Sequence, residues 1–261
     1  MSPEERNTSR SGEGSTSVVR RMSALLAAFG NRDTYLGVNE LARRTGIPKA
    51  TVSRLVKDME GVGFLERSGA RVGLGLRLFE LGERASRRRS VREVALPFMA
   101  DLREATGQTI HLAVLDGTEV VYVEILRGRN APRFPSAVGR RLPAHATGVG
   151  KALLAGSPND VIDAVIAAGL QRVGPRTITA PGSLLRQLKR ISASGIAYEH
   201  EESAPGVACV ASAIHVNGGP PVAAVSASGW LGKVDIRRVG PAVYTAALSI
   251  GRVLSTAIEP R

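Results

Sequence analysis

The chain has 261 residues, and its 35 Lys and Arg against 23 Asp and Glu give a formal net charge of +12. With 43% hydrophobic residues it can form one large or two modest domains with apolar cores, so wholesale disorder is excluded. The only cysteine, Cys209, leaves no intramolecular disulfide and no cysteine-based zinc site. No apolar run approaches the roughly 20 residues of a membrane span, so we expect a cytoplasmic protein with no membrane partner.

Positive charge is densest in the first third of the chain. Residues 1–90 carry 17 Lys and Arg against 10 Asp and Glu, whereas residues 91–261 carry 18 against 13 over nearly twice the length. Such a basic segment suits a polyanion, because Lys and Arg that neutralise phosphates release counterions, although it also serves solubility. The pattern changes near residues 86–90, where we place a domain boundary. Residues 1–16 are predicted to be a disordered tail.

Three helices and a hairpin are predicted after the tail. Apolar residues recur at helical spacing over 18–29 and 38–45, and Gly46 is a typical helix end. Pro48 suits the start of a third helix, which we expect to extend to residue 60. Two short strands follow at 64–67 and 71–74. This order is typical of a winged helix-turn-helix, whose third helix lies in the major groove of DNA.

The third helix carries most of the candidate DNA-binding residues. Its polar face bears cations for phosphates and hydroxyls for bases or phosphates. Together with one arginine of the hairpin, the candidates are Lys49, Thr51, Ser53, Arg54, Lys57 and Arg71. The alternative is a three-helix packing module with an ordinary solvated face, but such a face would normally carry more Glu.

The first ninety residues resemble a known family. The segments LARRTGIPKATVSRL at 41–55, GFLER at 63–67 and LGLRLFELG at 74–82 look like the DNA-binding half of the IclR-type bacterial transcription regulators. The resemblance implies a winged helix-turn-helix domain over 17–78 and a linker helix over 79–90. It also implies a regulator that binds operator DNA as a homodimer or a dimer of dimers. Repression and activation both stay open.

Residues 91–258 are predicted to form an α+β domain. Helices are expected over 91–106, 160–168, 183–194 and 236–257, and strands over 109–115, 119–126, 196–201, 207–216 and 222–228. The segments GRRLPAHAT at 139–147, GKA at 150–152, TIT at 177–179 and GVACVA at 206–211 resemble the effector-binding domain of the same family. That domain is GAF-like, with an antiparallel sheet that cups a small molecule.

The spacing of the last two strands predicts which residues share a face. If Asn217 faces Pro220 across the loop, Cys209 lies opposite Ser228, and Ala211 lies opposite Ser226. A loop one residue longer or shorter would flip one strand and break this grouping. The resemblance supports the unflipped register and implies an effector site formed by Gly148, Val149, Glu199, Cys209, Ser226 and Ser228. Their hydroxyls, with the start of a helix, would suit a small carboxylate.

Glu199-His200 departs from the family, which commonly has two adjacent Asp there. We therefore expect the acidic side chain of the pocket to be longer by one methylene group, and we expect the pocket to gain the imidazole of His200. Identity of the effector does not transfer from any one member.

An enzyme is the rival class. Residues 148–152 hold the Gly-Lys of a phosphate-binding loop but lack its first glycine and its Ser or Thr. The four histidines have no metal-binding spacing, and no cofactor is expected. A nucleophilic Cys209 with a histidine partner stays open, as does a ligand-free second domain used only for assembly, with Cys and Ser as core filler. We expect a regulator without enzymatic activity, controlled by a small metabolite with a carboxylic acid group.

Overall fold

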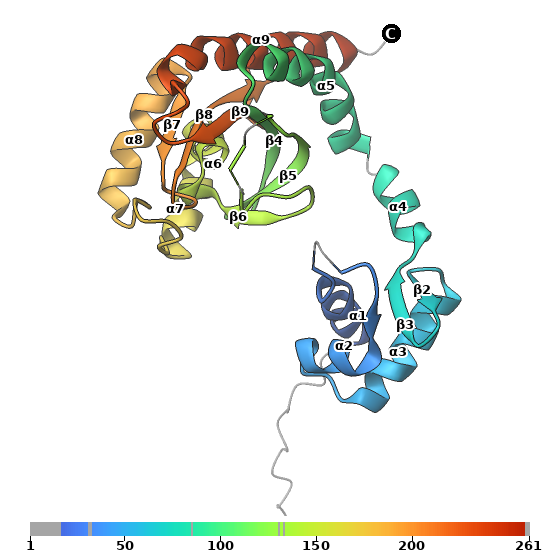
Figure 1. The fold of residues 1–261 in the computed structure, drawn as a ribbon. Helices are drawn as coiled ribbons and strands as arrows, with labels where there is room; N and C mark the ends of the chain where they lie inside the picture. The colour runs from blue at the N-terminus through green and yellow to red at the C-terminus, as the bar shows by residue number, and fades with distance from the viewer. Residues whose placement is uncertain (1–16, 31–32, 85, 130, 133, 259–261) are drawn as a thin grey trace, which may run out of the picture. The chain divides into compact units, whose positions relative to one another are not determined.

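The computed structural model describes residues 17–30, 33–84, 86–129, 131–132 and 134–258 (Figure 1). Contacts divide the chain into two units, and the boundary between them along the sequence falls between Ala85 and Ser86. The tail predicted over 1–16 lies outside the described residues. Among the helices that the structure describes, none is both long and apolar enough to cross a membrane.

The first unit contains the predicted helix-turn-helix and hairpin. Its elements are α1 (Val18–Ala27), β1 (Leu36–Gly37), α2 (Val38–Thr45), α3 (Lys49–Gly61), β2 (Leu65–Ser68), β3 (Arg71–Leu74) and α4 (Leu76–Glu83). The strands form an antiparallel sheet in the order β1-β3-β2, and β1 is too short to leave a pattern in the sequence. The helices pack through the apolar positions that the helical spacing predicts, including Val52, Leu55, Val56 and Met59 of α3.

The turn between α2 and α3 needs its glycine. Gly46 ends α2 with φ of 68°, a left-handed conformation that glycine adopts at little steric cost. Beside the turn, Arg44 of α2 donates hydrogen bonds to the carboxylates of Glu40 and Asp33 and to the carbonyl oxygen of Ala28. The bonds to Ala28 and Asp33 tie α2 to the chain that follows α1.

The linker helix predicted over 79–90 is divided between two helices. α4 ends at Glu83, and α5 (Ser86–Thr106) begins the second unit. Gly82 lies in the last turn of α4, and a glycine weakens a helix by about 1 kcal/mol relative to alanine. Ala85, between the two helices, lies outside the described residues, so the linker helix over 79–90 stays a prediction. α5 belongs with the sheet against which its apolar side chains pack.

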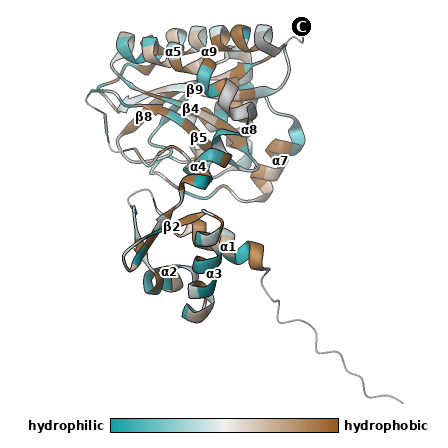
Figure 2. Ribbon diagram, turned by 90° about the vertical axis from the view of Figure 1, so that its right-hand side faces the viewer, coloured by the Kyte–Doolittle hydropathy of each residue, from teal (hydrophilic) through white to brown (hydrophobic). Residues whose placement is uncertain are grey.

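The second unit is built on a six-stranded antiparallel sheet in the order β6-β5-β4-β9-β8-β7. The strands are β4 (Thr109–Asp116), β5 (Glu119–Leu126), β6 (Arg141–Pro143), β7 (Ala197–His200), β8 (Val207–His215) and β9 (Pro221–Trp230). Helices α5 and α9 (Ile236–Ile258) lie side by side on one face (Figures 1 and 2). The other face carries the short helix η1 (Ala144–Ala146), α6 (Gly148–Ala155), α7 (Asn159–Ala167) and α8 (Pro181–Ser194).

The alternation of side chains divides the core of this unit in two. Leu112, Val210 and Val225 pack toward α5 and α9. Their neighbours on the opposite face include Ala211 and Ala224, small residues that pack with α6 and α8. The predicted register is confirmed, because Cys209 pairs with Ser228 and Ala211 with Ser226, and the one register shift between β8 and β9 comes later, at Ile214/His215.

Lys151 of α6 is a fully buried cation. Its Nζ donates to Oε1 and Oε2 of Glu202, at 2.5 and 2.7 Å, and to the carbonyl oxygen of Tyr198 at 2.9 Å. A fourth bond of 3.2 Å reaches Oε1 of Gln187. One ammonium group thus ties α6 to α8, to β7 and to the loop after β7.

We expect Lys151→Met to destabilise the second unit strongly, because the Glu202 carboxylate would be left buried without its cation. Breaking a buried ion pair in this way costs about 3–5 kcal/mol of the free energy of unfolding. Urea unfolding followed by circular dichroism would measure the loss.

The matched control is Lys189→Met, at an exposed position of α8, which should change the stability little. The double variant Lys151→Met/Glu202→Leu should recover part of the loss, since it removes the unpaired charge. Equal effects of Lys151→Met and Lys189→Met would contradict this role of the ion pair.

Candidate functional site

The outward face of α3 presents the predicted DNA-binding residues. Thr51 of α3 is half-buried, and Arg71 is exposed on β3. The other four residues are exposed on α3: Lys49, Ser53, Arg54 and Lys57. The opposite face of the helix is buried in the core of the unit. All six side chains therefore lie where a duplex could reach them.

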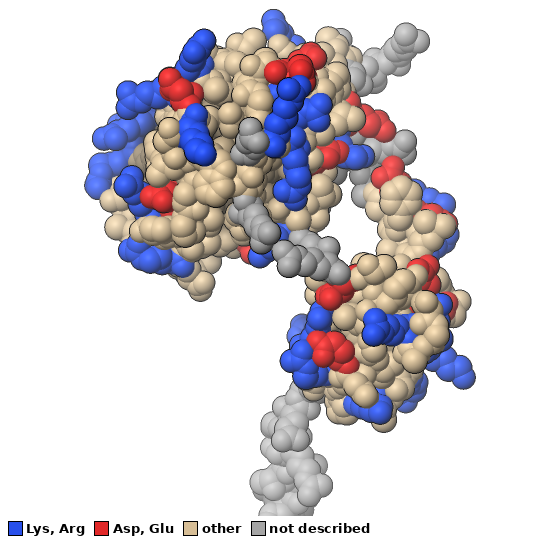
Figure 3. Space-filling model, viewed as in Figure 1, with Lys and Arg blue, Asp and Glu red and all other residues tan. Residues whose placement is uncertain are grey.

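Within the described part of the chain, the cations of this face have no carboxylate partner, whereas four other arginines of the unit do. Ion pairs join Arg43 and Arg44 to Glu40, Arg67 to Glu60 and Arg77 to Glu80. No ion pair joins a described carboxylate to Lys49, Arg54, Lys57 or Arg71. In Figure 3, blue side chains project from the end of the unit that holds α2 and α3. Their charge is available to phosphates.

Two further arginines lie beside the start of α3. Arg20 and Arg21 of α1 line a surface hollow together with Thr51 and the turn residues 45–48. The sequence singles out neither, because they come some thirty residues before the helix that they accompany. Only the packing of α1 against the turn brings them to this edge.

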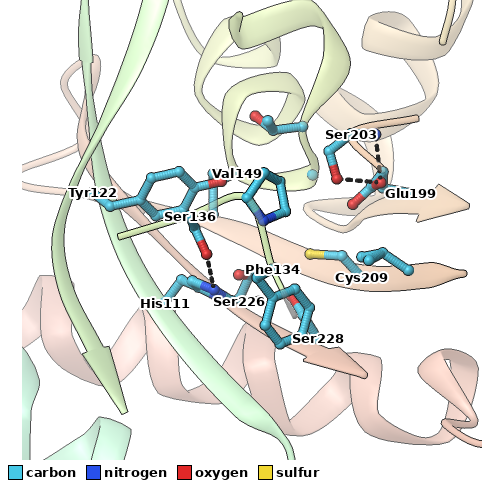
Figure 4. A pocket seen from close by; sticks show the side chains of 14 residues that line it. His111, Tyr122, Phe134, Ser136, Val149, Glu199, Ser203, Cys209, Ser226 and Ser228 are labelled. Carbon is cyan, nitrogen blue, oxygen red and sulfur yellow. Dashed lines mark hydrogen bonds between the residues drawn. The ribbon is translucent and has the colours of Figure 1, made fainter. Parts of the chain in front are cut away.

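The six predicted effector residues lie together in one pocket of the second unit (Figure 4). Gly148 and Val149 are the first residues of α6, and the other four come from neighbouring strands β7, β8 and β9. The ladder places Glu199 opposite Cys209, and Cys209 opposite Ser228. The pocket thus depends on the sheet register that the sequence predicts.

The pocket also contains residues that the sequence does not indicate. β4 contributes His111, β5 contributes Tyr122, and the segment between β5 and β6 contributes Phe134 and Ser136. β4 lies between β5 and β9, where His111 is the ladder partner of Ser226. That neighbourhood joins strands more than a hundred residues apart, so no local pattern could reveal it.

The start of α6 approaches the sheet closely. A Cβ atom added to Gly148 would come within 2.8 Å of Sγ of Cys209, so glycine is needed for this contact. Thr147 caps the helix, and its Oγ1 accepts a hydrogen bond from the Gly150 N–H at 3.0 Å. The N–H groups of the first two helical residues have no partner within a helix, and they give this end a partial positive charge.

Burial disfavours the charged forms of the ionisable groups of the pocket. Burial raises the pKa of Glu199 to about 7, even though Oε1 accepts hydrogen bonds from the N–H groups of Glu202 and Ser203 and from the Ser203 hydroxyl. Burial, followed by the charge of Arg127, lowers the pKa of His111 to about 3. No Lys or Arg is among the described lining residues. His200 is exposed and does not line the pocket, so the imidazole that we expect beside Glu199 is not part of the lining.

Cys209 does not have the surroundings of a nucleophile. Burial, followed by the charge of Glu199, raises the pKa of its thiol to about 12, although the neighbouring Ser228 and Ser226 oppose the shift. A cysteine attacks as a thiolate, which this environment disfavours at neutral pH. Among the described residues no cluster of His, Cys, Asp or Glu could hold a metal ion. The polar groups that line the pocket can therefore form hydrogen bonds with a ligand.

The cavity between these side chains is small. Its volume is about 20 Å³, which is room for about one water molecule. An organic acid could enter only if part of the lining moved outward.

We expect the stability of the protein to fall as pH rises through about 7, because of Glu199. Its pKa is about 7 in the folded protein against an ordinary 4.5, so the folded state keeps a proton that the unfolded chain has lost. From about pH 6 to about pH 8 this linkage amounts to roughly 1 kcal/mol of the free energy of unfolding. Glu199→Gln should abolish that part of the pH dependence, which urea unfolding at both pH values would measure. An identical pH dependence in both proteins would show that Glu199 is ionised in the fold.

Two family models match the chain. The IclR helix-turn-helix domain matches residues 18–69, and the model described as bacterial transcriptional regulator IclR C-terminal matches residues 84–252. The two matches cover the two units of the structure in the same order.

Similar proteins are regulators of the same kind. The HTH-type transcriptional regulator XynR of Escherichia coli K12 is 30% identical over 243 residues, which are 90% of this chain and 96% of XynR. The HTH-type transcriptional repressor AllR of Klebsiella pneumoniae is 32% identical over 223 residues, 84% of this chain and 82% of AllR. A crystal structure of an IclR homologue from Microbacterium hydrocarbonoxydans, complexed with 4-hydroxybenzoate, has a TM-score of 0.85 and 32% identity, and covers 92% of this chain and 100% of its own. This chain belongs to the IclR family of bacterial transcriptional regulators.

Proposed function

We propose that this chain controls transcription as an assembly of at least two copies, and that a small carboxylic acid bound in the second unit changes its affinity for operator DNA. The observation that carries the proposal is the convergence of the α6 N-terminus, ionisable groups whose charged forms burial disfavours, and small hydroxyl residues in one buried pocket. A relative of similar structure was crystallised with 4-hydroxybenzoate, which supports an acid as the effector.

On the DNA side, we assign different tasks to the six predicted DNA-binding residues. Thr51, Ser53 and Arg54 lie near the start of α3, the end of a recognition helix that comes nearest the base edges. Lys49, Lys57 and Arg71 supply phosphate contacts, because each is a cation with no carboxylate partner among the described residues.

A second copy is needed because one recognition helix reads only a few base pairs. Exposed apolar side chains support such an assembly. Val18 and Val19 on α1 are 57% and 72% exposed, and Leu76 and Phe79 on α4 are 68% and 65% exposed. A homodimer would cover these side chains, and a dimer of dimers would repeat the arrangement.

In the pocket, the carboxylate of the effector would face the free N–H groups of Gly148 and Val149. Ser226 and Ser228 offer hydroxyls, and Glu199 and Cys209 line the same side without a full negative charge at neutral pH. Coupling requires that the acid favour one arrangement of the assembly. A differential of about 1–3 kcal/mol would change operator affinity roughly 5- to 150-fold.

We infer that the protein is not an enzyme. The buried thiol of Cys209 is held protonated, and the neutral His111 lies beyond Ser228, with 3.5 Å between its Nδ1 and the serine Oγ. A regulator of this kind would release its ligand unchanged.

The smallness of the cavity favours one alternative. In this alternative, the second domain binds no ligand and serves only assembly, and Ser226 and Ser228 are small residues that only pack in the core.

The DNA assignment predicts two kinds of variant. Arg54→Ala should cost about 1–3 kcal/mol of binding free energy and relax the preference at one base pair if Arg54 reads a guanine. Lys57→Ala and Arg71→Ala should weaken all sequences alike and reduce the salt dependence. Fluorescence anisotropy would measure both effects, on a duplex selected from a random pool and on an unrelated duplex.

Arg77→Ala is the matched control, because Arg77 is paired with Glu80. If Arg54→Ala loses the same affinity on both duplexes, Arg54 is a phosphate contact. Light scattering on the same samples should show at least a dimer, and a monomer at micromolar concentration that shifts no operator would overturn the assembly.

For the pocket, a thermal-shift screen of organic acids should yield at least one that raises the Tm of the wild type. The variant Ser226→Leu/Ser228→Leu should lose that shift, because the leucines would fill the space and remove the hydroxyls. If no acid stabilises the wild type, or if the hit stabilises the variant equally, the ligand-free alternative holds.

A further inference from the structure

The Tyr122 hydroxyl has no hydrogen-bond partner among the described residues and is accessible from the pocket. Tyr122 is 6% exposed and lines the pocket, yet its hydroxyl makes no hydrogen bond with the part of the chain that the structure describes. Figure 4 shows the ring extending from β5 toward the middle of the lining residues. A hydroxyl that opens into a pocket without a protein partner is free to hydrogen-bond with a ligand there.

The position of Tyr122 is fixed from two sides. Its backbone N–H donates to the carbonyl oxygen of Arg140 at 3.2 Å, and its carbonyl oxygen accepts from the Gly139 N–H at 2.8 Å. Its ring lies against His111, with 5.3 Å between the centroids and 59° between the planes. The hydroxyl is therefore held in place on the pocket side of the sheet, where Cys209 and Glu199 also line the pocket.

His111 and Phe134 add a wall of rings beside Tyr122. The Phe134 ring packs edge-on against His111, with 5.2 Å between the centroids and 88° between the planes. The neighbouring Ser136 hydroxyl lies 2.9 Å from Nε2 of His111. These are the contacts that hold residues 134–136 over the pocket among the described residues, and they are weaker than the ladder bonds of the sheet.

An acid larger than a water molecule has to displace this segment. The sheet strands are joined by hydrogen-bonded ladders, and Lys151 ties α6 to the loop after β7. Residues 134–136 are therefore the part of the lining that moves most easily. A flat ring entering there would take the place of Phe134 against His111.

We propose that Tyr122 is a specificity-determining residue that donates its phenolic hydrogen to an oxygen of the effector, and that the rings beside it restrict the effector to aromatic carboxylates. This inference rests on the proposed function and names the class of acid. Burial also raises the pKa of Tyr122, so the phenol stays protonated and acts as a donor at neutral pH.

The test compares wild type with Tyr122→Phe, which removes only the hydroxyl. Tyr198→Phe is the matched control, because Tyr198 packs on the opposite face of the sheet with the α5 and α9 core. Calorimetric titrations would use benzoate, 4-hydroxybenzoate and cyclohexanecarboxylate, which share a carboxylate and a six-membered ring.

We expect the tightest aromatic acid to bind Tyr122→Phe about tenfold or more weakly than wild type. Tyr198→Phe should bind like wild type, and cyclohexanecarboxylate should bind wild type more weakly than benzoate. Without ligand, Tyr122→Phe should have at least the Tm of wild type, because the change breaks no hydrogen bond with a described residue.

Three outcomes would overturn the inference. Equal affinity of wild type and Tyr122→Phe would show that the hydroxyl does not contact the effector. A lower Tm of ligand-free Tyr122→Phe would show that the hydroxyl is structural. If only non-aromatic acids bind, the restriction to aromatic carboxylates is wrong while the proposed function stands, whereas failure of every acid would overturn the proposed function itself.

Discussion

The second unit depends on the close approach of the first turn of α6 to the sheet. Gly148 permits it, because any side chain at this position would collide with Sγ of Cys209. Ala211 of β8 and Ala224 of β9 lie on the same face of the sheet, and their short side chains leave space for α6 to approach. The contact brings N–H groups with no helical partner to a row of polar side chains. It also turns Lys151 inward, where the ammonium group requires Glu202 as a partner.

The two units offer negative charge two different environments. On the first unit, exposed cations of α3 and β3 have no carboxylate partner among the described residues, which suits phosphates that stay in contact with water. The pocket of the second unit instead has a helix terminus, hydroxyls, and titratable groups whose charged forms burial disfavours. A cation buried in the pocket would lose its hydration and would need a partner, as Lys151 does. Helix N–H groups and hydroxyls carry a smaller desolvation cost in free energy, so they suit the binding of the acid that we propose.

The same burial separates binding from catalysis. A protonated thiol, a neutral imidazole and a carboxyl group that titrates near neutrality can exchange hydrogen bonds with a ligand, but none is an activated nucleophile. The small cavity adds a mechanical condition, because the segment at Phe134 and Ser136 must yield before an acid enters. Such a displacement is a local event that an assembly could convert into a change of operator affinity.

The features that depend on residues close together in the chain could be predicted from the sequence. Helical spacing and Gly46 predict the helix-turn-helix, and the loop after β8 predicts the pairing of Cys209 with Ser228, because a short connection sets hairpin register locally. The linker helix over 79–90 stays a prediction, since a helical pattern alone does not show where α5 begins to pack on the sheet. Packing between distant segments places β4 beside β9, which brings His111 and Tyr122 into the pocket, and it pairs Lys151 with Glu202. Contacts between distant segments depend on how whole elements pack, and no local pattern specifies that packing.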